Sequence, residues 1–209
     1  MHSDTTSITA IAQAPKRRDD RREELFAAAL RQYAKHGYKR TRVEDIAAEL
    51  GLTKGAVYFY AKGKEELYRE AISWALGEWC SAIERSAARA SSSVERVSIL
   101  SRSSFAYVEA HHDLRSVIAR DPSIFSLDPA SDRFASVNDR ARGLLESAIR
   151  SGVASGEFRS TIDPSAASRF LYQVYITFLI KAFALGEGDE LAAQYEAGTD
   201  IALMGLAAR

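Results

Sequence analysis

The 209-residue sequence contains a single cysteine, Cys80, and only four prolines. One cysteine cannot form an internal disulfide, and such a sequence suits a reducing compartment. Few prolines, together with long stretches rich in Ala, Leu, Arg and Glu, favour helices, because these residues have high helix propensity. A disulfide-stapled fold is therefore excluded and a helical fold is expected.

Long apolar segments are also missing. The longest uncharged apolar run extends from Phe170 to Ile180, which is short of the roughly 20 residues that a membrane-spanning helix needs. Residues 1–15 are mostly Ser, Thr, Ala and Gln and lack the apolar core of a signal peptide. We therefore expect a cytoplasmic protein without a membrane partner, in which residues 1–18 form a flexible tail.

Motifs of the common catalytic sites are absent as well. The sequence has no G-x-S-x-G, P-loop or G-x-G-x-x-G pattern, and Cys80 has no C-x-x-C partner. His111 and His112 are adjacent, and neighbours on a helix point about 100° apart, so their imidazoles do not easily share one metal ion. We expect no enzyme, no metal and no cofactor.

The formal net charge is zero, but the charges are unevenly distributed. Thirteen Lys and Arg face seven Asp and Glu between Lys16 and Lys64, a net charge of +6, whereas the residues from Glu65 onward carry a net charge of −5. A basic N-terminal third on an acidic remainder indicates that one part of the protein meets an anion such as nucleic acid. The alternative is chance asymmetry on a solvated surface.

Apolar residues recur with helical periodicity, and no alternating run indicates a strand. This pattern predicts an all-α fold of about nine helices, with a small unit at residues 16–64 and a larger bundle after it. Gly37 ends the first helix, whose buried stripe comprises Phe26, Ala29, Leu30 and Tyr33. A capping box from Thr41 to Glu44 would start the second helix.

Further capping signals divide the rest of the chain. Ser92 and Glu95 form a capping box for a helix that extends to about His112. Three dipeptides place a capping Asp before a Pro at the first helical position: Asp121-Pro122, Asp128-Pro129 and Asp163-Pro164. The second is expected to open a long helix to about Gly152, the third a helix to Leu185, and a final helix would follow from about Asp189.

The most specific local pattern lies between Thr41 and Tyr60. Two short helices joined at Gly51, the second capped by Thr53, match a helix-turn-helix. The glycine is needed because the chain takes a left-handed conformation between steeply crossing helices. In this motif the second helix enters the major groove of DNA with its first residues near the base edges.

This stretch resembles the TetR family of transcriptional regulators, with its spacing intact over residues 19–79. The matching elements are Gly37, Thr41, Ile46-Ala47, Gly51-Leu52-Thr53, Lys54-Gly55-Ala56, Tyr58-Phe59-Tyr60 and Lys64-Glu65-Glu66-Leu67. The resemblance implies a DNA-binding domain at residues 19–79, with its motif at about 42–61. It also implies a ligand-binding and dimerisation domain at residues 80–209.

The chemistry of the side chains assigns roles within the motif. For phosphate contacts we expect Thr41, Tyr58, Tyr60 and Lys64. For base edges we expect Arg42, Thr53, Lys54 and Ala56, with Gly55 allowing close approach. Tyr58 and Phe59 could instead be core aromatics, an interpretation that we favour for Phe59, and Lys54 could be a solvated lysine.

The helix expected at residues 164–185 is apolar nearly all round, so it must be covered on both sides. One side can face its own bundle and the other a second copy; a central helix in a monomer is the alternative. By resemblance, this helix and the last one form the interface of a homodimer. The expected interface residues are Phe170, Val174, Phe178, Leu191, Tyr195, Ala202 and Leu206.

Aromatic residues are plentiful in the bundle, and the resemblance implies that some of them line an apolar effector pocket. The expected lining residues are Trp74, Phe105, His111, Arg115 and Tyr175. His111 and Arg115 are i, i+4 neighbours that can share a helix face, which would suit an anionic effector. Ordinary core packing is the alternative for the aromatics, and a solvated position is the alternative for Arg115.

Together these features predict a repressor that a small-molecule effector releases from a palindromic double-stranded DNA operator. The alternatives are a non-enzymatic ligand-binding or interaction protein on the same fold, and activation in place of repression. The identity of the effector does not follow from the sequence.

Overall fold

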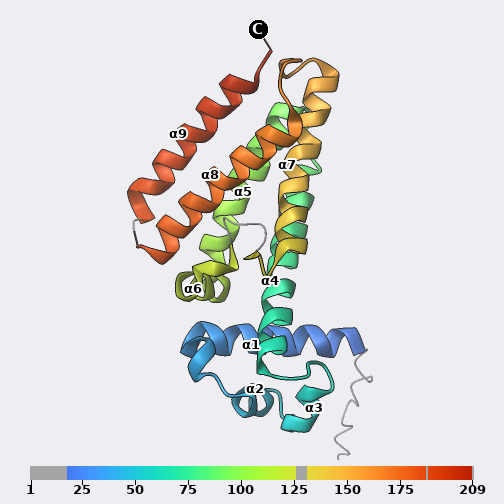
Figure 1. The fold of residues 1–209 in the computed structure, drawn as a ribbon, viewed down its shortest axis with the longest axis vertical. Coiled ribbons are helices and arrows are strands. Elements are labelled where there is room, and N and C mark those ends of the chain that lie inside the picture. The colour runs from blue at the N-terminus through green and yellow to red at the C-terminus, as the bar shows by residue number, and fades with distance from the viewer. Residues whose placement is uncertain (1–17, 126–130, 187, 209) are drawn as a thin grey trace, which may run out of the picture.

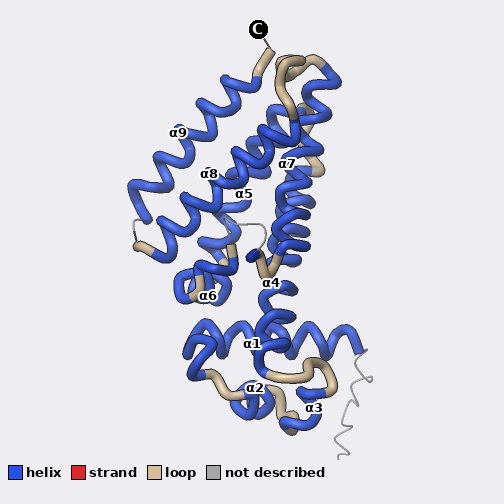
Figure 2. Tube along the Cα trace, viewed as in Figure 1, coloured by secondary structure: helices blue, strands red, loops and turns tan. Residues whose placement is uncertain are grey.

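The computed structural model describes residues 18–125, 131–186 and 188–208. Within these ranges the chain forms nine α-helices, one short 3-10 helix and a single isolated bridge between Phe158 and Ala207 (Figure 2). The predicted all-α fold is confirmed. The α-helices are α1 (Arg18–Arg40), α2 (Val43–Glu49), α3 (Lys54–Tyr58), α4 (Lys64–Ala87), α5 (Ser93–Ala110), α6 (His112–Arg120), α7 (Ala135–Ser155), α8 (Pro164–Ala184) and α9 (Gly188–Leu206).

The helices form two parts that share α4 (Figure 1). Helices α1–α3, here the N-terminal unit, lie at one end, and α5, α7, α8 and α9 form the C-terminal bundle at the other. Helix α4 begins in the N-terminal unit and continues into the bundle, while α6 packs against both α1 and α8. The expected domain boundary at residues 79–80 therefore falls inside one continuous helix. No helix in the described ranges is long and apolar enough to span a membrane.

The N-terminal unit follows the predicted pattern closely. The stripe of α1 is buried, and Gly37 ends its regular part with a φ of 74°. Gly51 has a φ of 65°, the left-handed conformation expected between the two short helices. The Thr53 side chain accepts a hydrogen bond from the Ala56 N–H and caps α3, as predicted.

The capping box predicted at Thr41 is wrong. Helix α2 starts at Val43 with Arg42 at the N-cap position, and no side chain caps it. The Thr41 hydroxyl donates instead to the carbonyls of Gln32 and Gly37, at 3.0 and 2.9 Å. It therefore ties the start of the motif back to α1.

Two of the later capping predictions are confirmed and others are not. Ser92 caps α5 and Asp163 caps α8, as predicted. Asp121 makes no cap for the 3-10 helix Pro122–Ile124. Helix α7 begins only at Ala135, so the long helix predicted from Asp128-Pro129 starts too early, and that dipeptide lies outside the described residues.

The segment after α7 closes the far end of the bundle. Gly152 lies against the ring of Phe158, whose N–H donates to the Gly152 carbonyl at 2.9 Å. The Glu157 carboxylate accepts hydrogen bonds from the backbone N–H groups of Ser93 and Val94, at 2.8 and 3.4 Å. These N–H groups are at the start of α5, where the helix itself offers them no acceptor. The tight turn that follows α7 is therefore hydrogen-bonded to the start of α5.

Candidate nucleic-acid interface

Helix α3 lies at the end of the molecule that is remote from the bundle (Figure 1). Its first residues are open to solvent: Thr53, Lys54 and Gly55 are exposed and Ala56 is half-buried. Val57 is fully buried in the hydrophobic core, and α3 packs against α2. A short helix anchored by one side and exposed at its N-terminus has the geometry of a recognition helix.

A basic cleft adjoins α3. It is open to solvent and has a volume of about 620 Å³. Five of the nine residues that line it are cationic, so the cleft favours an anion such as a phosphate backbone. Its lining residues are Lys39, Arg40, Thr41, Arg42, Val43, Glu44, Lys54, Tyr58 and Lys64.

Lys64 lines this cleft from the N-terminus of α4. Its ammonium donates to the Lys39 carbonyl at 3.0 Å and lies 4.7 Å from the centre of the Tyr38 ring. The first turn of α4 also presents backbone N–H groups, which favour an anion. Lys64 is thus positioned before any ligand arrives, which reduces the conformational entropy lost on binding.

Lys54 is already paired in the structure. Its ammonium lies 2.6 Å from the Glu44 carboxylate, and this hydrogen bond lowers the pKa of Glu44 and raises that of Lys54. Both side chains are about half-exposed, at 48% for Lys54 and 56% for Glu44. Exposed pairs are weak, so a guanine or a phosphate can compete for Lys54 at little cost.

The structure contradicts the predicted phosphate contact of Thr41. The residue is 2% exposed, its hydroxyl proton is committed to two carbonyls, and its N–H donates to the Gly37 carbonyl. It has no donor left for a phosphate. Its role is structural.

The sequence analysis missed Lys39 and Arg40, which line the cleft from the segment that follows Gly37. Their position two and three residues after the glycine could have indicated them, because the chain turns at Gly37 toward the motif. The interpretation of Phe59 as a core aromatic is wrong, since its side chain is 77% exposed. Tyr58 is 41% exposed, and Tyr60 is half-buried.

The outer face of α8 and α9 differs in part from the predicted interface. Phe170 is 64% exposed, and Val174, Phe178 and Ala202 are half-buried along an apolar groove of about 250 Å³. Leu191, Tyr195 and Leu206 are buried inside their own bundle instead, at 4%, 7% and 6% exposure, so their assignment to a dimer interface is wrong. The residues that α9 exposes in their place are Ile201, at 70%, and Met204, at 77%.

Most of the residues predicted to line the effector pocket lie elsewhere in the structure. His111 is the exposed N-cap residue of α6, at its junction with α5, and its carbonyl accepts a hydrogen bond from the Arg115 N–H at 2.9 Å. The ring of His111 stacks on Tyr107 on the surface. Phe105 packs on Phe183.

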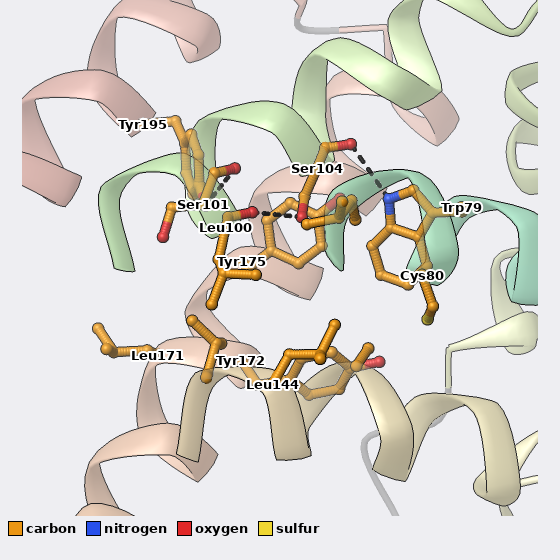
Figure 3. A pocket seen from close by; sticks show the side chains of 13 residues that line it. Trp79, Cys80, Leu100, Ser101, Ser104, Leu144, Leu171, Tyr172, Tyr175 and Tyr195 are labelled. Carbon is orange, nitrogen blue, oxygen red and sulfur yellow. Dashed lines mark hydrogen bonds between the residues drawn. The ribbon is translucent and has the colours of Figure 1, made fainter. Parts of the chain in front are cut away.

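A different cavity lies in the centre of the bundle, between α4, α5, α7, α8 and α9 (Figure 3). Of the five predicted pocket residues, Tyr175 lines it, whereas Trp74, Phe105, His111 and Arg115 do not. Trp79, Ser101, Ser104 and Tyr172 line it as well. Trp79 is on the buried face of α4, one turn beyond Trp74, and the helical period alone could not rank the two.

Two consecutive residues at the end of α6 connect the bundle to the N-terminal unit. Arg120 donates to the carbonyls of Ala34 and Lys35 in α1, at 2.9 and 3.4 Å. Asp121 accepts a hydrogen bond from the Tyr68 hydroxyl in α4 at 2.8 Å. Burial acts against the charge of Asp121, but hydrogen bonds from Ser123, Tyr68 and Arg133 keep its pKa below the ordinary value. The end of α6 is therefore hydrogen-bonded to both α1 and α4.

Comparison with known proteins shows which proteins share this sequence pattern and this fold. Residues 25–71 match the family model described as bacterial regulatory proteins, tetR family. The HTH-type transcriptional repressor KstR2 of Mycolicibacterium smegmatis is 30% identical over 162 residues, which are 75% of this chain and 77% of the relative. A TetR transcription regulator from Haloarcula marismortui has the same fold, with a TM-score of 0.76 at 21% identity over 90% of this chain and 99% of that one.

A further solved structure has the same fold with a ligand bound. It is the regulator FadR from Bacillus subtilis in complex with stearoyl-CoA, with a TM-score of 0.74 at 18% identity over 88% of this chain and 98% of that one. The family match covers the helix-turn-helix, and the KstR2 match extends over most of both chains. The chain therefore belongs to the tetR family of bacterial regulatory proteins and is a DNA-binding transcriptional regulator.

Proposed function

We propose that this regulator is a repressor that binds a palindromic operator as a homodimer and leaves it when a small molecule enters the C-terminal bundle. The observation that carries the proposal is the exposed N-terminus of α3 beside the basic cleft. The KstR2 relative is a repressor by name, and the FadR structure holds an acyl-CoA. Both support repression and an effector here.

The DNA contacts divide by chemistry. We assign the base-edge contacts in the major groove to Arg42, Lys54 and Ala56, with the capping Thr53 and the small Gly55 beside them. The phosphate contacts come from Lys64, Tyr58 and Tyr60. Lys39 and Arg40 take the place of Thr41 in this set, because they line the same cleft with cationic side chains.

The second copy packs on the outer face of α8 and α9. Phe170, Ile201 and Met204 expose apolar surface there beside the apolar groove. Large exposed apolar patches mark interaction sites, and a two-fold axis at this face would present two recognition helices to the two halves of a palindrome. Ile201→Asp should therefore give a monomer by light scattering after size exclusion. Ser147→Asp, on the exposed side of α7, should stay dimeric.

The DNA contacts are tested by recovering and sequencing genomic fragments that bind the purified protein. A palindromic site should be enriched. Lys64→Ala should weaken binding to every sequence and reduce the slope of log affinity against log salt by about 1, whereas Lys54→Ala should relax preference at particular bases. Binding that is weak and equal on all sequences would contradict the proposal and leave an interaction or ligand-binding protein.

A further inference from the structure

The cavity in the centre of the bundle has a chemistry of its own. We propose that it binds an uncharged, flat, mostly apolar compound with one acceptor oxygen, such as an aryl ketone, and that the Tyr175 hydroxyl donates to that oxygen. This inference rests on the proposed function and names the effector class.

None of the described residues that line the cavity is an Asp, Glu, Lys, Arg or His. Its titratable groups stay neutral, because burial raises the pKa of Cys80 to about 11 and that of Tyr195 to about 12. A carboxylate or phosphate without a cationic partner is costly to bury. The cavity therefore selects against anions.

One donor on the wall is unused. The Tyr175 hydroxyl is buried and has no acceptor within hydrogen-bond distance in the described chain; the nearby Ser104 hydroxyl lowers the pKa of Tyr175 by less than burial raises it. The two other tyrosines of the wall are engaged: Tyr172 donates to the Asn138 side chain at 3.2 Å, and Tyr195 to the Ser101 carbonyl at 3.4 Å. A buried donor without an acceptor is destabilising, so a ligand that brings an acceptor oxygen gains a hydrogen bond that the empty protein lacks.

The neighbouring Ser104 hydroxyl is not free to donate to a ligand as the Tyr175 hydroxyl is. Ser104 donates its proton to the Leu100 carbonyl at 2.5 Å, and the indole N–H of Trp79 points to the Ser104 carbonyl at 3.4 Å (Figure 3). Both donors are thus turned toward backbone oxygens. Tyr175 is therefore the buried donor on the described wall that remains for a ligand oxygen, whereas the Ser101 hydroxyl, which also lines the cavity, belongs to a half-buried residue that water can reach.

The shape of the cavity favours a flat ligand. The rings of Trp79 and Tyr175 are nearly parallel, with an interplanar angle of 12° and centroids 6.1 Å apart. The free space is about 30 Å³, which is room for about two water molecules. The half-buried side chains of Leu144 and Leu171 must therefore move to admit a ring compound. Because Trp79 is on α4, the same expansion presses on the helix that leads to the N-terminal unit.

Calorimetric titration of the full chain with three naphthalenes of one frame tests the inference. The wild type should bind 2-acetylnaphthalene about fivefold more tightly than 2-ethylnaphthalene, the factor expected for one net hydrogen bond. It should bind 2-naphthoate at least tenfold more weakly than the ketone. The ketone preference should vanish in Tyr175→Phe. It should persist in the control Tyr107→Phe, whose ring stacks on His111 outside the cavity.

Three results would overturn the inference: a ketone preference that survives in Tyr175→Phe, naphthoate or stearoyl-CoA bound as tightly as the ketone, or no binding of any probe. An operator-shift assay on the same samples distinguishes an error in the effector class from an error in the proposed function. If operator DNA is bound while the ligand test fails, the effector class alone is wrong. If no operator is bound, the proposed function itself fails.

Discussion

Gly152→Ala is the substitution at which helix propensity and packing make opposite predictions. Gly152 is in the last turn of α7, where alanine would stabilise the helix by up to about 1 kcal/mol. A methyl group there would lie 2.6 Å from Cε2 and 2.9 Å from Cγ of Phe158, and closer still to Cδ2. The Phe158 ring is 1% exposed, and its backbone is fixed by the hydrogen bond to Gly152 and the bridge to Ala207. The ring cannot move aside.

Overpacking costs about 1–3 kcal/mol, and an overlap with a fixed ring belongs at the upper end of that range. After the propensity gain, the net destabilisation is about 2 kcal/mol, which lowers Tm by roughly 4–8 °C for a chain of this length. Thermal unfolding followed by circular dichroism measures it. The double variant with Phe158→Leu should lose less than the sum of the two single losses, because the ring is the obstacle. An unchanged or raised Tm for Gly152→Ala would refute the packing argument.

Four further substitutions test single contacts. Thr41→Val should lower the free energy of unfolding by about 1 kcal/mol and leave the slope of log affinity for DNA against log salt unchanged. A reduced slope would show that Thr41 does contact a phosphate. Arg120→Ala should cost about 1 kcal/mol, because it removes a hydrogen bond to the Ala34 carbonyl, and hydrogen exchange should rise at the end of α1. Phe59→Ser should change stability by less than about 0.5 kcal/mol, whereas a large loss in chemical denaturation would show a packing role. Tyr175→Phe should raise Tm without any ligand, by roughly 2–4 °C for about 1 kcal/mol gained; a lower Tm would mean that the hydroxyl has a partner.

The N-terminal unit was predictable because its signals are local. Gly37 and Gly51 sit where a left-handed conformation is needed, and Thr53 caps the helix that follows it. Each depends on residues within one or two turns. Thr41 was misjudged because its hydroxyl bonds to the carbonyl of Gln32, nine residues earlier, and that contact depends on how α1 folds back on the loop.

The bundle was less predictable because periodicity defines a stripe but not what covers it. On α9 the sequence offers two apolar faces, and packing against α5 and α8 buries the one with Leu191 and Tyr195 while Ile201 and Met204 stay outside. The stripe of α8 posed the same choice. Which face becomes the core is decided by the shape of the neighbouring helices.

The family, the all-α fold, the helix-turn-helix and its basic surroundings could all be read from the sequence, because capping, glycine conformation and charge are properties of short segments. The tertiary structure alone decided which side chains are free to act. It buried Thr41, exposed Phe59, brought Lys39 beside Lys64 and left the Tyr175 hydroxyl unpaired in the bundle. These outcomes depend on contacts between segments far apart in the chain, which local patterns do not encode.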